Sequence, residues 1–395
     1  MNLFLDNTGL HAAGESLDGR SRGDADVKGL LQLGTLLIFA ERLHLNGFEL
    51  DTVAGRTREI RDMLVELGLP SSSLAIGDQD DVIYGRACIS AANAAADDLA
   101  SLSSTAMVSA GPVAPTGLPE GAMAQEAADM LSILSATRSE TPRHFHLTAL
   151  QSRARGAAVY MLASSSKLRR AVKDCFPAPG ELSPAVLEQL GIFLRLYLND
   201  ALAEERKATY TPAVSRAAMM RQQFTSLIHG METVVENAAA ALTPRTLGVP
   251  AVSAALLDRS KGEPAAVVAE ALRLRDDAKG MRRRISTIAT KVVEGGPAGQ
   301  FELGEELRDA RRAVHESLGL AQVPRLLDAL EIQLILGVIP KAKIKPAAAL
   351  DAYESWRRRR RYAVLTELSK SAAYSVHQQR NWEKLVQASS RKKRG

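Results

Sequence analysis

The chain has 395 residues, 46% hydrophobic, 24% charged and only 4% aromatic, a composition that excludes wholesale disorder and favours packed helices over an all-β sandwich. Its two cysteines are too few for a disulfide framework and no apolar run spans a membrane, so we expect a cytoplasmic protein without membrane partners. The net charge of +5 is uneven, because residues 1–110 hold 16 acidic and 8 basic residues whereas residues 341–395 hold 15 basic and 4 acidic ones.

The first hundred residues predict a small α/β unit. Residues 2–6 have the pattern of a short buried strand that ends on Asp6, and a polar, glycine-containing stretch follows. Asn46 and Gly47 form a turn pair, which predicts a small hairpin over 43–50. A further strand is expected at 74–77, and helices are expected at 27–42, 57–67 and 81–99.

The stretch 99–119 carries no charged residue and holds three prolines within eight residues, which rules out a helix there and predicts a linker. Helical periodicity dominates the rest of the chain. One helix start has a clear signal, with Ser183 as the N-cap and Pro184 in the first turn. Helices are expected at 123–137, 147–172, 184–207, 212–241, 264–293, 303–318 and 347–388, and the apolar run 330–339 fits a strand or a helix.

These patterns predict a mainly α fold with a small N-terminal α/β subdomain followed by a multi-helix domain. The expected division is an acidic α/β subdomain over 1–98, a linker over 99–119, a helical domain over 120–340 and a basic C-terminal helical region over 341–395.

At the start of the chain a hydrophobic strand ends on Asp6, and a small polar residue and a turn glycine follow. This opening is similar to that of PIN-domain ribonucleases, and Glu41 and Asp81 stand where that family places its second and third acids. The resemblance covers about residues 1–100 and implies catalytic carboxylates that bind Mg²⁺ or Mn²⁺, which prefer oxygen ligands. The family's fourth acidic element is expected near 100–115, where this sequence has the uncharged stretch.

A structural role for the same acids is the alternative. Asp6 then caps a turn, and Glu41 and Asp81 are solvated charges at helix ends, with Asp81 favourable at a helix N-terminus.

The basic end is the second candidate site. Arg357, Arg358, Arg359, Arg360 and Arg361 lie between Trp356 and Tyr362, and the chain closes with Lys392, Lys393 and Arg394. Arginine forks suit phosphate and stack on bases, which favours contact with RNA or DNA. Pairing with the acidic N-terminal segment, or a solvated tail, would explain the same residues.

A third group of arginines lies mid-chain, at Arg273 and Arg275 and at Arg282 to Arg284. Such a cluster drawn from neighbouring helices would suit an anionic ligand. Ion pairing between helices, with acids such as Asp276 and Asp277, is the other interpretation.

Taken together, the residues favour a cytoplasmic protein that acts on or binds nucleic acid. A metal-dependent nuclease of a bacterial defence or toxin system is one hypothesis. The alternative is a non-catalytic helical scaffold or regulatory subunit that binds a protein partner, so whether the chain is an enzyme stays open.

Overall fold

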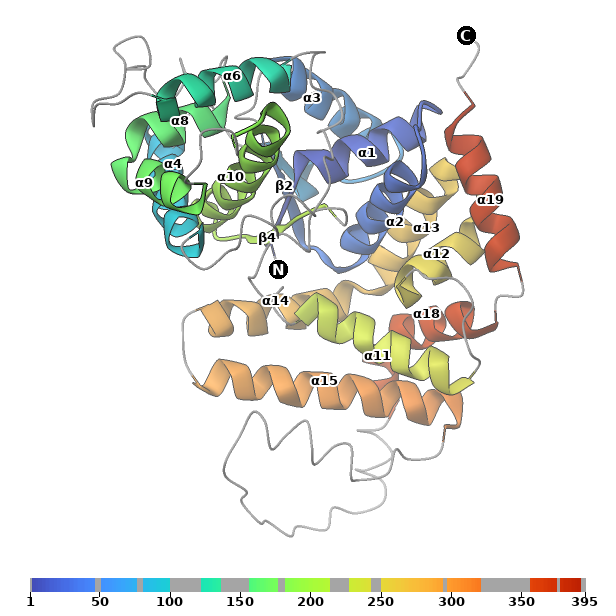
Figure 1. The fold of residues 1–395 in the computed structure, drawn as a ribbon. Helices are drawn as coiled ribbons and strands as arrows, with labels where there is room; N and C mark the ends of the chain where they lie inside the picture. The colour runs from blue at the N-terminus through green and yellow to red at the C-terminus, as the bar shows by residue number, and fades with distance from the viewer. Residues whose placement is uncertain are drawn as a thin grey trace.

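The computed structural model describes residues 2–46, 51–76, 81–99, 122–135, 156–176, 182–213, 227–242, 250–293, 297–320, 356–374 and 377–391. Most of these residues are helical, and four short strands form one parallel sheet, which confirms the prediction of a mainly α fold with a small N-terminal α/β part (Figure 1). Leu99, the first residue of the expected linker, ends a helix, and residues 100–119 and the run 330–339 lie outside the described residues.

The sheet has the strand order β3-β2-β1-β4, with every neighbouring pair parallel. Its strands are β1 (Asn2–Leu5), β2 (Arg42–Leu45), β3 (Leu74–Ile76) and β4 (Thr209–Thr211). Because β2 pairs with β1 on one side and β3 on the other, it is an inner strand. Both described partners of β2 are parallel, whereas a hairpin partner would be antiparallel, and residues 47–50 of the expected hairpin lie outside the described residues.

Helices pack around the sheet (Figure 1), and the buried side chains form two hydrophobic clusters, each of which includes residues of the strands. One cluster joins Phe4 and Tyr210 to α4 (Asp81–Leu99), α6 (Ala122–Ser135), α8 (Ala157–Ser164), α9 (Ser166–Cys175) and α10 (Pro184–Glu205). The other joins α1 (Asn7–Leu17), α2 (Asp24–Phe39) and α3 (Asp51–Glu66) to the helices that follow residue 226.

The later helices are α11 (Leu227–Leu242), α12 (Ala251–Ser260), α13 (Pro264–Asp277), α14 (Lys279–Val293), α15 (Pro297–Leu318), α18 (Ala363–Tyr374) and α19 (Gln378–Ser389). Residues 356–361 are also helical. The expected boundary at residue 98 does not separate two cores, because β4 completes the N-terminal sheet and each cluster mixes early with late elements.

Helix α1 extends into the polar, glycine-containing stretch that follows Asp6. Asp6 is its N-cap, and its glycines serve close packing rather than turns. A Cβ added at Gly14 would lie 2.6 Å from Ile60 of α3, and one added at Gly29 of α2 would lie 2.6 Å from Ala12. The cost of glycine within these helices is thus offset by close approach of their neighbours. By contrast, the local signal at α10 is confirmed, since Ser183 Oγ accepts a hydrogen bond from the Val186 N–H.

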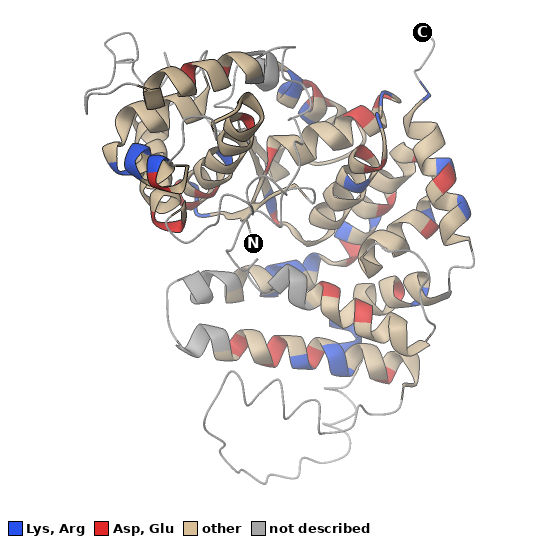
Figure 2. Cartoon of the chain, viewed as in Figure 1, with Lys and Arg blue, Asp and Glu red and all other residues tan. Residues whose placement is uncertain are grey.

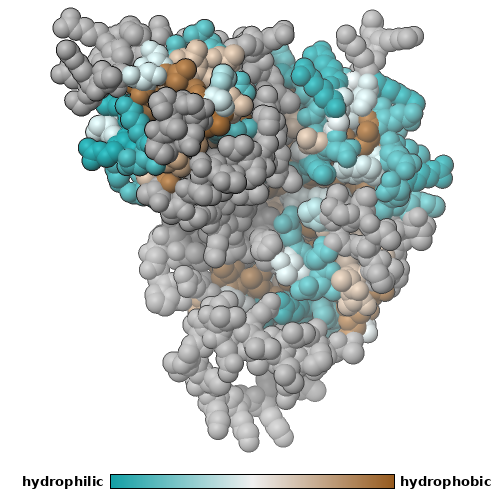
Figure 3. Space-filling view, in the orientation of Figure 1, coloured by the Kyte–Doolittle hydropathy of each residue, from teal (hydrophilic) through white to brown (hydrophobic). Residues whose placement is uncertain are grey.

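Hydrophilic residues cover much of the region around α1 and α19 in the view of Figure 3. Among the helices that the structure describes, none is both long and apolar enough to cross a membrane.

Glu232 of α11 carries the clearest pH dependence. Burial raises the pKa of its carboxyl from 4.5 to about 7. Ionisation of Glu232 therefore destabilises the folded state. This destabilisation is absent below pH 4.5, grows as the pH rises towards 7 and is complete above pH 7. Glu232→Gln is expected to raise the free energy of unfolding at pH 8 by about 2–3 kcal/mol and to change it little at pH 4.5. Urea unfolding of both proteins across this range measures the difference, and parallel pH profiles would contradict it.

Candidate functional site

Asp6 lies at the carboxyl end of β1 and is almost completely buried. Its Oδ1 accepts a hydrogen bond of 2.6 Å from the Thr8 N–H, and its Oδ2 accepts one of 2.6 Å from the Tyr210 hydroxyl. The first contact caps α1 and the second ties β1 to β4. Asp6 thus has the capping role that the structural alternative assigns to it.

Glu41 lies at the other edge of the sheet, immediately before β2, and is exposed. The Ser286 hydroxyl hydrogen-bonds the Glu41 carboxylate and, together with the Arg282 charge, lowers the pKa of that carboxyl despite partial burial. Its neighbours are therefore residues of α14 rather than the other predicted catalytic acids.

The strand register separates Asp6 from Glu41. Asn2 pairs with Arg42 and Leu5 with Leu45, so the two acids flank opposite ends of the parallel pair. At about 3.3 Å per residue, they lie roughly 16 Å apart along the strands. One metal ion with oxygen ligands at about 2.0–2.6 Å cannot join them. The prediction that Asp6 and Glu41 share an ion is wrong, because a residue after a helix enters the amino edge of a parallel sheet whereas a residue after a strand lies at its carboxyl edge.

Asp81, the third predicted acid, is the first residue of α4, and its side chain lies outside the described part of the structure. Among the described residues, no group of three His, Cys, Asp or Glu side chains is placed to hold a metal ion. The strand register therefore excludes one Mg²⁺ or Mn²⁺ ion shared by Asp6 and Glu41, and a metal-binding role for Asp81 stays a prediction.

The carboxyl edge around Asp6 is polar. The Asn46 side-chain amide donates a hydrogen bond of 2.9 Å to Asn199 Oδ1, and both residues are buried. Asn7 is buried too, and its side-chain nitrogen and oxygen have no hydrogen-bond partner within the described residues. This edge lies where the strand order reverses between β1 and β4, a position at which α/β sheets often bind ligands.

A basic cavity of about 410 Å³ lies at the opposite, amino edge. It is lined by Asn2, Glu41, Arg42, Ser72, Ser73, Arg275, Lys279, Arg282 and Arg283. Five of these side chains are basic and one is acidic. The basic residues at the start of α14 are visible in Figure 2.

Two of the cavity's arginines have structural contacts. Arg275 donates hydrogen bonds to the carbonyls of Leu37, Ala40 and Glu41, which end α2 and lead into β2. Arg282 donates to the carbonyl of Arg275. Both guanidinium groups are buried, and burial together with the Arg275 charge lowers the pKa of Arg282 to about 10.

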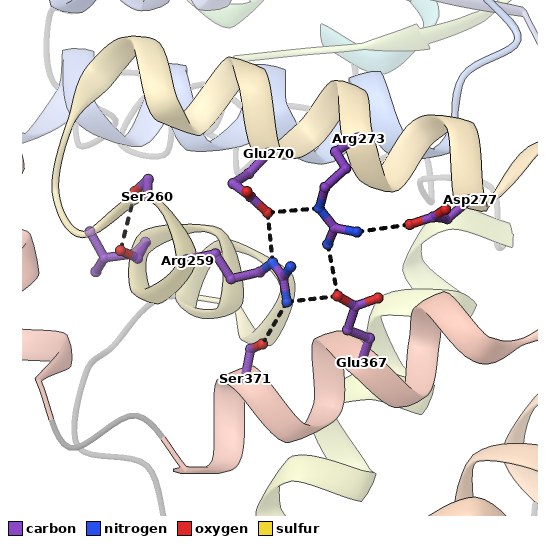
Figure 4. A network of polar contacts seen from close by, with 8 residues as sticks. Arg259, Ser260, Glu270, Arg273, Asp277, Glu367 and Ser371 are labelled. Atoms are coloured by element: carbon purple, nitrogen blue, oxygen red, sulfur yellow. Dashed lines mark hydrogen bonds and ion pairs between the residues drawn. The ribbon is translucent and has the colours of Figure 1, made fainter.

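Arg273 of the mid-chain arginine group forms ion pairs both within α13 and with α18, and Arg259 of α12 shares two of its acidic partners. Arg273 contacts Glu270, Asp277 and Glu367, and Arg259 contacts Glu270 and Glu367 (Figure 4). Burial disfavours the charged form of Glu270, but hydrogen bonds from both arginines outweigh this effect and lower the pKa of its carboxyl. For Arg273 the inter-helix pairing interpretation is the one observed.

The arginine run of residues 357–361 divides into two sets. Arg358 lies 3.8 Å from Asp309, and Arg361 lies 3.8 Å from Glu306, both acids belonging to α15. Arg357, Arg359 and Arg360 are exposed, and no described carboxylate lies within ion-pair distance of them. The observed acidic partners of this run come from α15 and not from the N-terminal segment.

An aromatic side chain accompanies the exposed set. Trp356 is 52% exposed, and the Arg360 guanidinium lies 5.5 Å from the centre of its ring. Lys392, Lys393 and Arg394, the other predicted nucleic-acid contacts, lie outside the described residues.

Sequence patterns did not single out Arg42, Lys279 or the two serines of the cavity. Arg42 starts a strand and Lys279 starts a helix, so each looks like an ordinary terminal charge. Only the pairing of β2 with β1 and the packing of α13 against α2 bring them together. Comparison of the chain with protein-family models, with curated proteins and with solved structures gives no match.

Proposed function

We propose that this protein binds single-stranded nucleic acid through the exposed side of residues 356–360. One observation carries the proposal: Arg357, Arg359 and Arg360 project from a helix without acidic partners among the described residues, beside the exposed ring of Trp356. Arginine neutralises phosphate and stacks on bases, and an exposed aromatic ring offers a stacking platform that any base can use.

The two inward arginines support this arrangement. Arg358 and Arg361 approach acids of α15, and the buried Tyr362 hydroxyl donates a hydrogen bond of 2.6 Å to Glu306. These contacts hold one side of the helix against α15, so the other three arginines are presented on a fixed support. Fixed donors lose less side-chain entropy on binding than donors on a mobile tail.

The proposal is limited to binding. Asp6 and Glu41 lie at opposite edges of the sheet and do not form a joint metal site, so no hydrolytic step is assigned to them. The resemblance to PIN-domain ribonucleases rests on the strand that ends at Asp6, and a catalytic role for Asp6 or Asp81 stays a prediction.

Replacement of Arg357, Arg359 and Arg360 by Gln is expected to weaken binding of labelled single-stranded DNA and RNA to a similar degree across sequences, since phosphate contacts do not read bases. The slope of log affinity against log salt should fall by about 2, because each lost phosphate contact on a single strand contributes about 0.7. Fluorescence anisotropy over a salt series measures both effects.

A matched control removes the same charge elsewhere. Lys167, Arg170 and Lys173 are exposed on α9, which belongs to the other hydrophobic cluster. Their triple replacement by Gln should leave affinity and salt slope nearly unchanged. An equal loss of affinity in both triple variants would show that the effect depends on net charge alone, which would contradict a site at residues 356–360. An unchanged affinity after replacement of Arg357, Arg359 and Arg360 would overturn the proposal and favour a protein-binding scaffold.

A further inference from the structure

The basic cavity at the amino edge of the sheet is independent of the arginine run and of the proposed nucleic-acid contact. Its walls come from four separate parts of the chain: Asn2 of β1, residues 41–42 before and in β2, the 3₁₀ turn Ser71–Ser73, and the α13–α14 junction. We propose that this cavity binds a small phosphate-bearing molecule, with Arg42, Lys279 and Arg283 as its anion contacts.

The donors available to a ligand can be separated from those already used. The terminal nitrogens of Arg275 already donate hydrogen bonds to three backbone carbonyls and to Ser73 Oγ. Arg282 donates hydrogen bonds to backbone carbonyls. Lys279 and Arg283 are exposed, and neither has an acidic partner within the described residues. Within the described part of the chain, Arg42 donates a hydrogen bond only from its Nε, to the Ser72 carbonyl at 3.3 Å. These three side chains can therefore direct donors at a bound anion.

The charge of the cavity is not balanced by its own acid. Glu41 is the one carboxylate among the lining residues, and it already accepts a hydrogen bond from Ser286. Burial places Arg275 and Arg282 near each other in a poorly solvated wall, where like charges repel. An anion in the cavity would offset this repulsion, so binding should stabilise the folded protein.

The chemistry of the lining favours phosphate over a single carboxylate. Arginine forks and a lysine ammonium group match several phosphate oxygens at once, and Ser72 and Ser73 add hydroxyl groups. A volume of about 410 Å³ falls within the usual range of small-molecule sites, about 300–1,000 Å³. A ligand held here would contact the sheet and the α13–α14 helices together.

The test uses inorganic pyrophosphate as the probe, with sodium chloride at matched ionic strength as the reference. Pyrophosphate is expected to raise the melting temperature of the full chain in a concentration-dependent way and to bind at one site by calorimetry. Lys279→Gln combined with Arg283→Gln should weaken this binding tenfold or more, because each charge-assisted contact contributes on that scale. Both replaced side chains are exposed, so the fold should persist.

Arg170→Gln combined with Lys173→Gln is the control, since it removes one arginine and one lysine from α9. The control variant should bind pyrophosphate like the parent, and so should the variant that replaces Arg357, Arg359 and Arg360. An equal rise of melting temperature in sodium chloride, or undiminished binding by the Lys279 and Arg283 variant, would overturn the proposal. Loss of pyrophosphate binding after replacement of Arg357, Arg359 and Arg360 would also overturn it, because the anion would then bind at the arginine run.

Discussion

Arg195→Met is expected to lower the free energy of unfolding by about 3–5 kcal/mol, since it leaves a buried carboxylate without its counter-ion. Arg195 of α10 and Glu126 of α6 are both buried, and the guanidinium is paired with the carboxylate. The second carboxylate oxygen of Glu126 accepts a hydrogen bond of 3.2 Å from the Ala158 N–H at the start of α8. The pair therefore joins three helices of one cluster, and urea unfolding measures its loss.

A surface ion pair provides the comparison for this prediction. Arg86 lies 3.0 Å from Glu205, but its side chain is 60% exposed. Arg86→Met should cost less than about 1 kcal/mol, because solvent screens exposed pairs. The double variant Glu126→Leu with Arg195→Met should recover much of the loss, since no unpaired charge then remains buried. A single Arg195→Met variant as stable as Arg86→Met would contradict the prediction.

Arg275→Met is expected to destabilise the protein by about 3–5 kcal/mol, because several charge-assisted hydrogen bonds are lost together. Helix α2 ends at Phe39, and the last carbonyls of a helix have no partners within it. Arg275 satisfies the Leu37 carbonyl at 2.8 Å and the Glu41 carbonyl at 2.7 Å. Without it, these carbonyls face a buried wall, so hydrogen exchange across the α2–β2 connection should accelerate along with the loss of stability.

Two further variants sharpen this test. Arg275→Lys should recover only part of the loss, since one ammonium group cannot reproduce a planar fork that spans separate acceptors. Arg273→Met removes an arginine two residues away whose side chain is 42% exposed and whose partners lie at the surface (Figure 4). Its cost should be nearer 1 kcal/mol. Equal costs at positions 273 and 275 would show that burial does not set the difference.

The candidate sites differ in how much of each can be predicted from sequence patterns. The arginine run is visible in the sequence, and its division into paired and exposed members follows once the helix packs against α15. Asp6 is placed correctly at the end of a strand because a short apolar run is a signal carried by a few neighbouring residues. Its separation from Glu41 depends on the parallel register with β2, which no local pattern contains.

By itself, the sequence determined the features that arise from neighbouring residues. Apolar spacing predicts α4, and a serine followed by proline predicts the start of α10. Tertiary structure alone decided that β4 joins the sheet about two hundred residues after β1, that glycines in α1 and α2 mark close helix contacts, and that Arg275 caps a distant helix. The physical reason is range: caps and periodicity act within one or two turns, whereas strand pairing and the burial of charge depend on residues that only the folded chain brings together.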